Sequence, residues 1–149
     1  MMPFALLLSV ALGWIAVVLV MATTALPYLL RPTALARALG LAGSLAGNLV
    51  ERMRPHMWLG YMILAVSGLH AVAAMGSGSP RINPTGIGFA TIALVLLCGQ
   101  WLLGNRLMLR AIEQRQRVRR WHFGAMLGTF AAIFAHAYLN GALLRAFIP

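Results

Sequence analysis

Charged residues are scarce in this chain. Only 9% of its 149 residues are charged and 61% are hydrophobic, whereas a soluble domain carries about 25% charged residues. Glu51 and Glu113 are the only acidic residues, and lysine is absent. This deficit excludes an ordinary soluble domain and assigns the chain to the membrane class. The length suits one helical bundle and leaves no room for a second folded domain.

Cysteine is almost absent as well. The single Cys98 lies within an apolar run, so the chain forms no intramolecular disulfide and has no CxxC metal or redox motif. We interpret Cys98 as a small buried hydrophobic residue.

The net charge of +10 arises from twelve arginines. Such a basic balance often indicates nucleic acid or acidic lipid as a partner. Here the arginines cluster at the ends of apolar runs, where membrane topology and lipid headgroups explain them. We therefore expect a lipid membrane as the partner, and no nucleic acid.

Four stretches carry no charge, namely 1–30, 55–80, 82–105 and 121–144. Each exceeds the roughly 20 residues that a helix needs to cross about 30 Å of hydrocarbon. The first lacks a basic start and is too long for a signal peptide, so we interpret it as a retained helix. The sequence predicts an all-α, integral membrane four-helix bundle, a single transmembrane domain over 1–149. Its helices are expected at about 4–30, 55–75, 86–108 and 120–146.

The arginines are distributed unevenly between these helices. The connections 31–54 and 106–120 hold ten of them, and Arg81 and Arg145 are the only ones on the other side. The positive-inside rule then predicts that both termini lie outside the cytoplasm of a bacterial inner membrane. Within the first connection, Thr33 can cap a helix and leucines recur at near-helical spacing. We expect a short interfacial helix at about 33–50 on the cytoplasmic surface.

The histidine pattern carries the strongest functional signal. His56 and His70 lie in the second predicted helix and His122 and His136 in the fourth, and both pairs are 14 residues apart. Because 14 residues complete almost four turns and rise about 21 Å, both imidazoles of a pair share one helix face. The two helices run parallel, so His56 is expected level with His122, and His70 level with His136. Two facing imidazoles at one depth can bind a haem iron from both sides.

A haem needs space and charge compensation in addition to ligands. Small residues on the histidine faces would leave room for a macrocycle, although they equally favour close helix packing. Arg54 and Arg120 precede His56 and His122, where they could pair with haem propionates or serve only as topology determinants. Unrelated histidines at the interface or between helices are the plainer interpretation, and the repeated spacing argues against it.

These stretches resemble a known type of helix. Arg54-Pro-His56 with His70, and Arg119-Arg-Trp-His122 with His136, are similar to haem-binding helices. Such helices occur in the cytochrome b of quinol-oxidising complexes and in ferric-reductase-like transmembrane domains. Those families have more spans than four, and this chain has no quinone-site motif and no flavin or nicotinamide domain. The resemblance therefore implies only that the four histidines are metal ligands.

Together these observations predict a diheme b-type cytochrome with two haem b groups. It would transfer electrons across the membrane as a subunit of a larger redox complex, without a substrate-converting site of its own. Its partners would be redox proteins or subunits on both faces, and a quinone is kept as a candidate. Two alternatives stay open: a (bacterio)chlorophyll-binding subunit and a cofactor-free scaffold subunit. A transporter fits poorly, because no span contains an acidic residue.

Overall fold

A computed structural model of the chain describes residues 4–29, 49–78, 83–109 and 112–141. These residues form four α-helices and no strand: α1 (Phe4–Leu29), α3 (Leu49–Gly76), α4 (Pro84–Leu109) and α5 (Ile112–Asn140). The predicted all-α four-helix bundle is confirmed. The expected interfacial helix at 33–50 lies outside the described residues, apart from residues 49 and 50, with which α3 begins.

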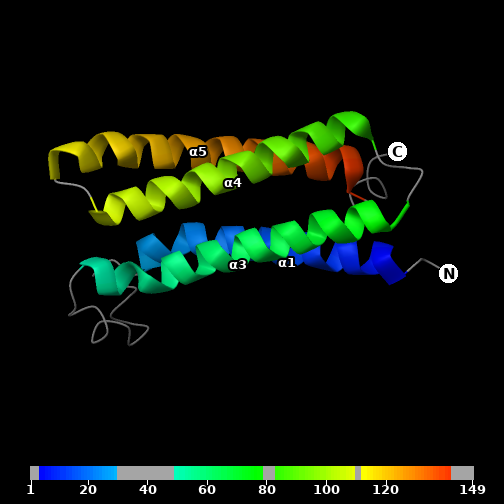
Figure 1. Ribbon diagram of the computed structural model, residues 1–149, viewed down its shortest axis with the longest axis horizontal. Helices are drawn as coiled ribbons and strands as arrows, with labels where there is room; N and C mark the ends of the chain where they lie inside the picture. Colours follow the sequence, from blue (N-terminus) through cyan, green and yellow to red (C-terminus); the bar gives the residue numbers. More distant parts are fainter. Residues whose placement is uncertain (1–3, 30–48, 79–82, 110–111, 142–149) are drawn as a thin grey trace.

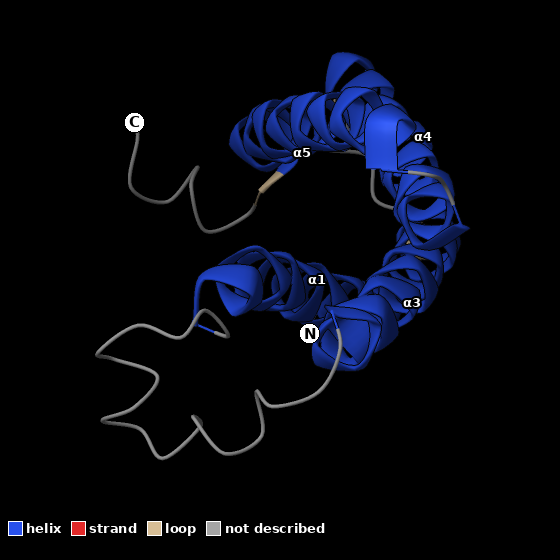
Figure 2. Ribbon diagram, turned by 90° about the vertical axis from the view of Figure 1, so that its left-hand side faces the viewer, coloured by secondary structure: helices blue, strands red, loops and turns tan. Residues whose placement is uncertain are grey.

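The helices are arranged as two hairpin-like pairs. Helix α1 packs along α3 and α4 packs along α5, and the contact between the two pairs is made mainly by α3 and α4 (Figure 1). Viewed along the bundle, the four helices follow an arc in the order α1, α3, α4, α5 (Figure 2). Helix α5 lies opposite α1 across the opening of the arc, and α3 and α5, which carry the histidines, lie diagonally across its inside (Figure 2).

All four helices are long and apolar enough to cross a membrane. The apolar segments are Phe4–Pro27, Met53–Gly76, Pro84–Met108 and Gln114–Asn140. Large apolar side chains are exposed along every one of them, for example Val18 at 63%, Val72 at 64%, Val95 at 64% and Phe134 at 70%. A soluble bundle would bury such a surface, whereas lipid covers it at no cost. The chain is thus a multi-pass membrane protein.

Two helices are longer on one side than the sequence predicts. Helix α3 begins at Leu49 instead of residue 55, and α5 begins at Ile112 instead of residue 120. A charge-free stretch indicates which residues cross the hydrocarbon. The helix itself extends further, because its backbone hydrogen bonds continue into segments whose arginines reach water. Pro55 inside α3 removes one N–H donor without ending the helix. At the other end, α5 stops at Asn140 rather than at residue 146.

The buried interior is a narrow column. Thr129 is the most buried residue, at 1% exposed, and its hydroxyl donates to the Ala125 carbonyl oxygen at 2.8 Å and accepts from Gln100 Nε2 at 2.5 Å. Cys98 does not belong to this column: it is exposed, so our interpretation of it as a buried residue is wrong. An apolar run inside a membrane does not distinguish a lipid-facing cysteine from a core one. Among the residues that the structure describes, the other buried ones are Ser9, Val20, Ile63, Gly86, Ala93 and Ala132.

Candidate functional site

The structure brings the four histidines together in the two pairs that their spacing predicts. His56 of α3 faces His122 of α5, with ring centroids 6.2 Å apart. His70 faces His136 in the same way, with centroids 6.0 Å apart. The planes of the rings are crossed in both pairs, by 67° and 80°. Each pair therefore joins the two halves of the bundle at one depth.

Every one of these imidazoles is held by a backbone carbonyl of the neighbouring helix. A carbonyl oxygen only accepts hydrogen bonds, so Nδ1 must carry the proton in each ring. The four bonds run from His56 Nδ1 to Thr23 O at 3.1 Å, from His70 Nδ1 to Ser9 O at 2.7 Å, from His122 Nδ1 to Gln100 O at 3.1 Å, and from His136 Nδ1 to Gly86 O at 2.9 Å. Nε2 is then the basic nitrogen in all four neutral rings.

The four Nε2 atoms are available as ligands. None of them has a hydrogen-bond partner within the part of the chain that the structure describes. A neutral imidazole whose Nδ1–H donates to a carbonyl is the form in which histidine binds metals, because the second bond fixes the tautomer and the ring orientation. The second contacts of these histidines thus favour metal ligation over simple packing.

The separation of the rings fits one metal ion between each pair. A metal–nitrogen bond is about 2.0 Å, and Nε2 lies roughly 1.2 Å from the ring centroid, so two coaxial ligands place their centroids about 6.4 Å apart. The observed 6.2 Å and 6.0 Å come within a few tenths of an ångström of that value. The described residues contain no group of three or more His, Cys, Asp or Glu side chains that could hold a metal ion. Each pair therefore offers two imidazoles, one from α3 and one from α5.

After the predicted orientation of the bundle, we call His56 and His122 the inner pair and His70 and His136 the outer pair. A pocket opens beside the inner pair. It contains about 540 Å³ of empty space, including space open to the outside, and Gly60 of α3 and Gly104 of α4 are among its lining residues. Without side chains at these two positions, a flat group could approach both helices. The sequence predicted the small residue at 60, whereas Gly104 comes from a helix without histidines and was missed.

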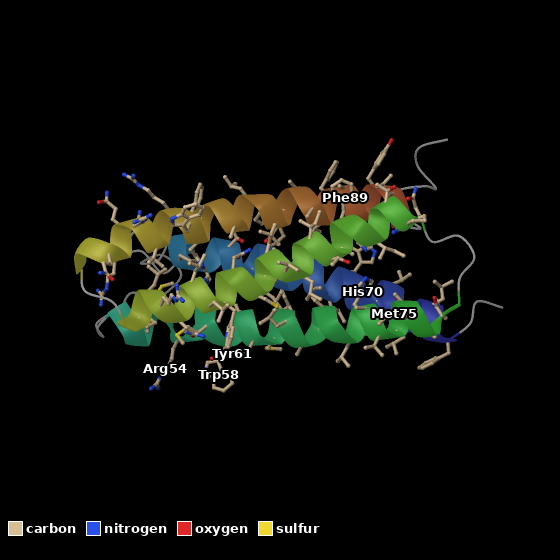
Figure 3. All side chains as sticks on the ribbon, turned by 45° about the horizontal axis from the view of Figure 1, so that its top comes forward. Arg54, Trp58, Tyr61, His70, Met75 and Phe89 are labelled. Carbon is tan, nitrogen blue, oxygen red and sulfur yellow. The ribbon has the colours of Figure 1, made fainter. Side chains whose placement is uncertain are left out.

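The aromatic residues Trp58, Tyr61 and Trp101 form a cluster on the lipid side of this pocket. The ring centroids of Trp58 and Tyr61 are 6.1 Å apart, and those of Tyr61 and Trp101 are 6.0 Å apart. Figure 3 shows Trp58 and Tyr61 near Arg54, at the end of α3 opposite Met75. Tryptophan and tyrosine concentrate at the membrane–water boundary, so we expect this cluster to lie near one face of the membrane.

The outer pair, His70 and His136, is packed more closely by α1. Gly13 lies against the His70 ring, because a Cβ at this position would be 3.1 Å from Cε1 and 3.2 Å from Nδ1. The buried Ser9 hydroxyl is also 3.4 Å from His70 Nδ1. A larger residue at position 13 would force the His70 ring to move. Sequence reasoning missed Gly13, since a glycine in an apolar run equally indicates ordinary helix packing.

The two arginines predicted to compensate haem propionates lie at the end of the bundle nearer the inner pair. Arg54 and Arg120 are both exposed, and neither lines the pocket. In Figure 3 the Arg54 side chain extends outward from α3. The structure therefore does not bring these arginines to the histidines, and their pairing with propionates stays a prediction.

Comparisons with known proteins add no family to this picture. No protein-family model matches the chain, and neither a curated protein nor a solved structure matches it. Any assignment of function therefore rests on the geometry of the two histidine pairs.

Proposed function

We propose that this protein is a diheme b-type cytochrome that carries electrons across a membrane. His56 and His122 would bind the inner haem, and His70 and His136 the outer one. The observation that carries the proposal is the same for both pairs: crossed imidazoles with centroids 6.2 Å and 6.0 Å apart, each with Nδ1 bonded to a backbone carbonyl. Four histidines with unrelated structural roles would not require this repeated arrangement.

The residues of the chain define what such a site can do. When bound, haem supplies a one-electron ferric–ferrous couple. An imidazole on each side leaves no open coordination position, which favours electron transfer over oxygen chemistry. The carbonyl bonds hold the four ligand rings, so little reorganisation accompanies a change of charge. Ile63 on α3 and Thr129 on α5, both buried, lie midway between the two histidine levels on their helices.

The proposed setting follows from the small amount of chain outside the spans. The protein would be a subunit of a larger redox complex in a bacterial inner membrane, with donor and acceptor proteins or subunits on opposite faces. A membrane quinone is retained as a candidate partner. We therefore propose electron transfer as its role and assign it no substrate-converting site of its own.

A visible and electron paramagnetic resonance (EPR) spectrum of the purified protein tests the proposal directly. We expect two haems per chain by pyridine haemochrome analysis, and two strongly anisotropic low-spin ferric EPR signals. Crossed imidazole planes interact almost equally with the iron dxz and dyz orbitals, so these orbitals stay nearly degenerate and the anisotropy is large. Parallel planes would separate the orbitals and reduce it. The crossing angles of 67° and 80° are the basis of this expectation.

Other spectra would reject it in distinct ways. Chlorophyll absorption would favour the pigment-binding alternative, in which each pigment needs only one histidine. A colourless protein with intact helices would favour the scaffold alternative. One haem per chain would contradict the proposal that both histidine pairs bind haem.

We also predict the orientation of the bundle. Single cysteines are introduced at Ser77, beyond the end of α3, and at Gln114, near the start of α5, in a Cys98→Ala background. Because arginines concentrate in 31–54 and 106–120, position 114 should react only from the cytoplasmic side and position 77 only from the other. Labelling of both positions from one side would refute the parallel course of α3 and α5.

A further inference from the structure

The outer end of α4 is held by a small network of side-chain and backbone bonds. Asn83 precedes the helix, and its side-chain oxygen accepts from the backbone N–H groups of Thr85 at 2.9 Å and Gly86 at 3.4 Å. This is the N-cap arrangement, in which a short polar side chain satisfies the first free donors of a helix. Asn83 thus fixes where α4 begins.

A second asparagine, Asn140 at the end of α5, holds Asn83 in turn. Its side-chain oxygen accepts from the backbone N–H of Asn83 at 2.7 Å, and its Nδ2 donates to the carbonyl oxygen of Asn83 at 3.3 Å. One amide group therefore engages both backbone groups of the capping residue. Bonds of this kind at the edge of a membrane are costly to leave unmade, because few other partners are available.

Gly86 joins this network to the histidine site. Its carbonyl oxygen accepts from His136 Nδ1 at 2.9 Å, and its own N–H is capped by Asn83. Gly86 is buried, and a Cβ at this position would collide with the Asn140 amide. The absence of a side chain at 86 is therefore what allows the amide to reach Asn83. His136, Gly86, Asn83 and Asn140 form a closed circuit of contacts between α4 and α5.

The matching position in the other half of the bundle has no such group. Asn140 lies one helical turn after His136, and the residue one turn after His70 on α3 is Ala74. His70 relies instead on the Ser9 carbonyl oxygen at 2.7 Å and the close contact with Gly13. The network of Asn83, Gly86 and Asn140 is thus specific to His136 and has no counterpart at His70. A contact that only joined the ends of α4 and α5 would not need to involve Gly86, whose carbonyl oxygen accepts from His136 Nδ1.

We propose that Asn140 is a positioning residue for His136. It holds Asn83, and through Asn83 the Gly86 carbonyl, and so sets the plane of the His136 ring relative to His70. This inference rests on the proposed haem ligation. Without the amide, the first turn of α4 can shift, and the His136 ring turns with the carbonyl to which it is bonded. The crossing angle of 80° in the outer pair would then change, while the inner pair is unaffected.

The test compares four variants of the full-length protein: Asn140→Ala, Gly86→Ala, the double variant and Gly88→Ala. Gly88 is the control, because a Cβ there meets no atom within 4 Å. We expect Asn140→Ala and Gly86→Ala each to shift or broaden the outer haem's EPR signal and to change its midpoint potential, or to lose that haem alone. The double variant should do no more than either single one, since both changes break the same contact. Gly88→Ala should match the parent.

The outcomes separate this inference from the proposed function. A parent with two haems and an Asn140→Ala variant with unchanged outer signal and potential would overturn the positioning role alone, as would additive effects in the double variant. A parent without haem would overturn both. If Asn140→Ala does not accumulate, Asn140→Asp is measured instead. It keeps the acceptor for Asn83 N–H and loses the donor to Asn83 O. Because its added charge shifts the potential by itself, only the EPR signal of the outer haem is compared, and this signal is expected to change.

Discussion

Alanine at His70 and alanine at His136 are expected to give the same result: loss of one haem per protein, with the other haem retained. These residues lie on different helices, but their rings form one pair, with centroids 6.0 Å apart. Removal of either would leave the haem of this pair with one protein ligand instead of two, so we expect that haem to be lost. His56→Ala and His122→Ala should form the complementary pair and lose the inner haem. Pyridine haemochrome counts and EPR spectra of the four purified variants measure this.

The level pairing rests on helix geometry. Pairing across levels, for example of His56 with His136, would require one iron to span about 21 Å along the bundle, whereas each iron–imidazole bond is about 2 Å.

Ile63→Ala is the matched control. Ile63 lies midway between His56 and His70 on α3 and is buried, so its truncation perturbs the interior without removing a ligand. It should retain both haems. Two results would contradict haem binding by the two level pairs. One is that all four single histidine variants keep two haems. The other is that His70→Ala resembles His56→Ala rather than His136→Ala.

The pairing of the histidines could be predicted from the sequence because the α-helix has a fixed period. A spacing of 14 residues, used twice, determines both the shared face and the matched depth, provided that α3 and α5 run parallel. The number of helices followed from charge-free stretches for a similar reason, since hydrocarbon does not tolerate charge. The ends of the helices could not be predicted from the charge-free stretches. Helix α3 continues past Arg54 and Pro55 to Leu49, where the chain is no longer constrained by hydrocarbon.

The contacts that orient the histidines could not be predicted. Each Nδ1 bonds to a backbone oxygen, and any residue type supplies one, so Ser9, Thr23, Gly86 and Gln100 share no chemical signature. Only their own repeated spacing of 14 residues, seen once the partners are known, connects them. Nothing in the sequence distinguishes Asn140 from the other residues on the histidine face of its helix. Its bonds to Asn83 depend on how α4 and α5 meet, which a single sequence does not specify.

Replacing both Arg54 and Arg120 with glutamine is expected to lower the midpoint potential of the inner haem and to leave the outer haem nearly unmoved. Reduction adds an electron, so a nearby positive charge favours the ferrous state and its removal disfavours it. At about 10 Å and an effective dielectric constant of about 20, one unit charge contributes roughly 1.7 kcal/mol, and solvent screening of exposed side chains reduces this. Both arginines are exposed, so we expect a decrease of tens of millivolts.

Arg117→Gln provides the control for this redox titration. Arg117 is also exposed and lies on the same helix, but it precedes His122 by roughly 7.5 Å of helix rise, compared with roughly 3 Å for Arg120. At the greater distance, water and salt screen the charge more strongly, so the Arg117 variant should shift the inner haem less than Arg120→Gln does alone. The outer haem is more than a Debye length from both positions, so its midpoint potential should not change. If neither haem shifts in the Arg54→Gln, Arg120→Gln protein, these arginines set the membrane topology and do not compensate the propionates.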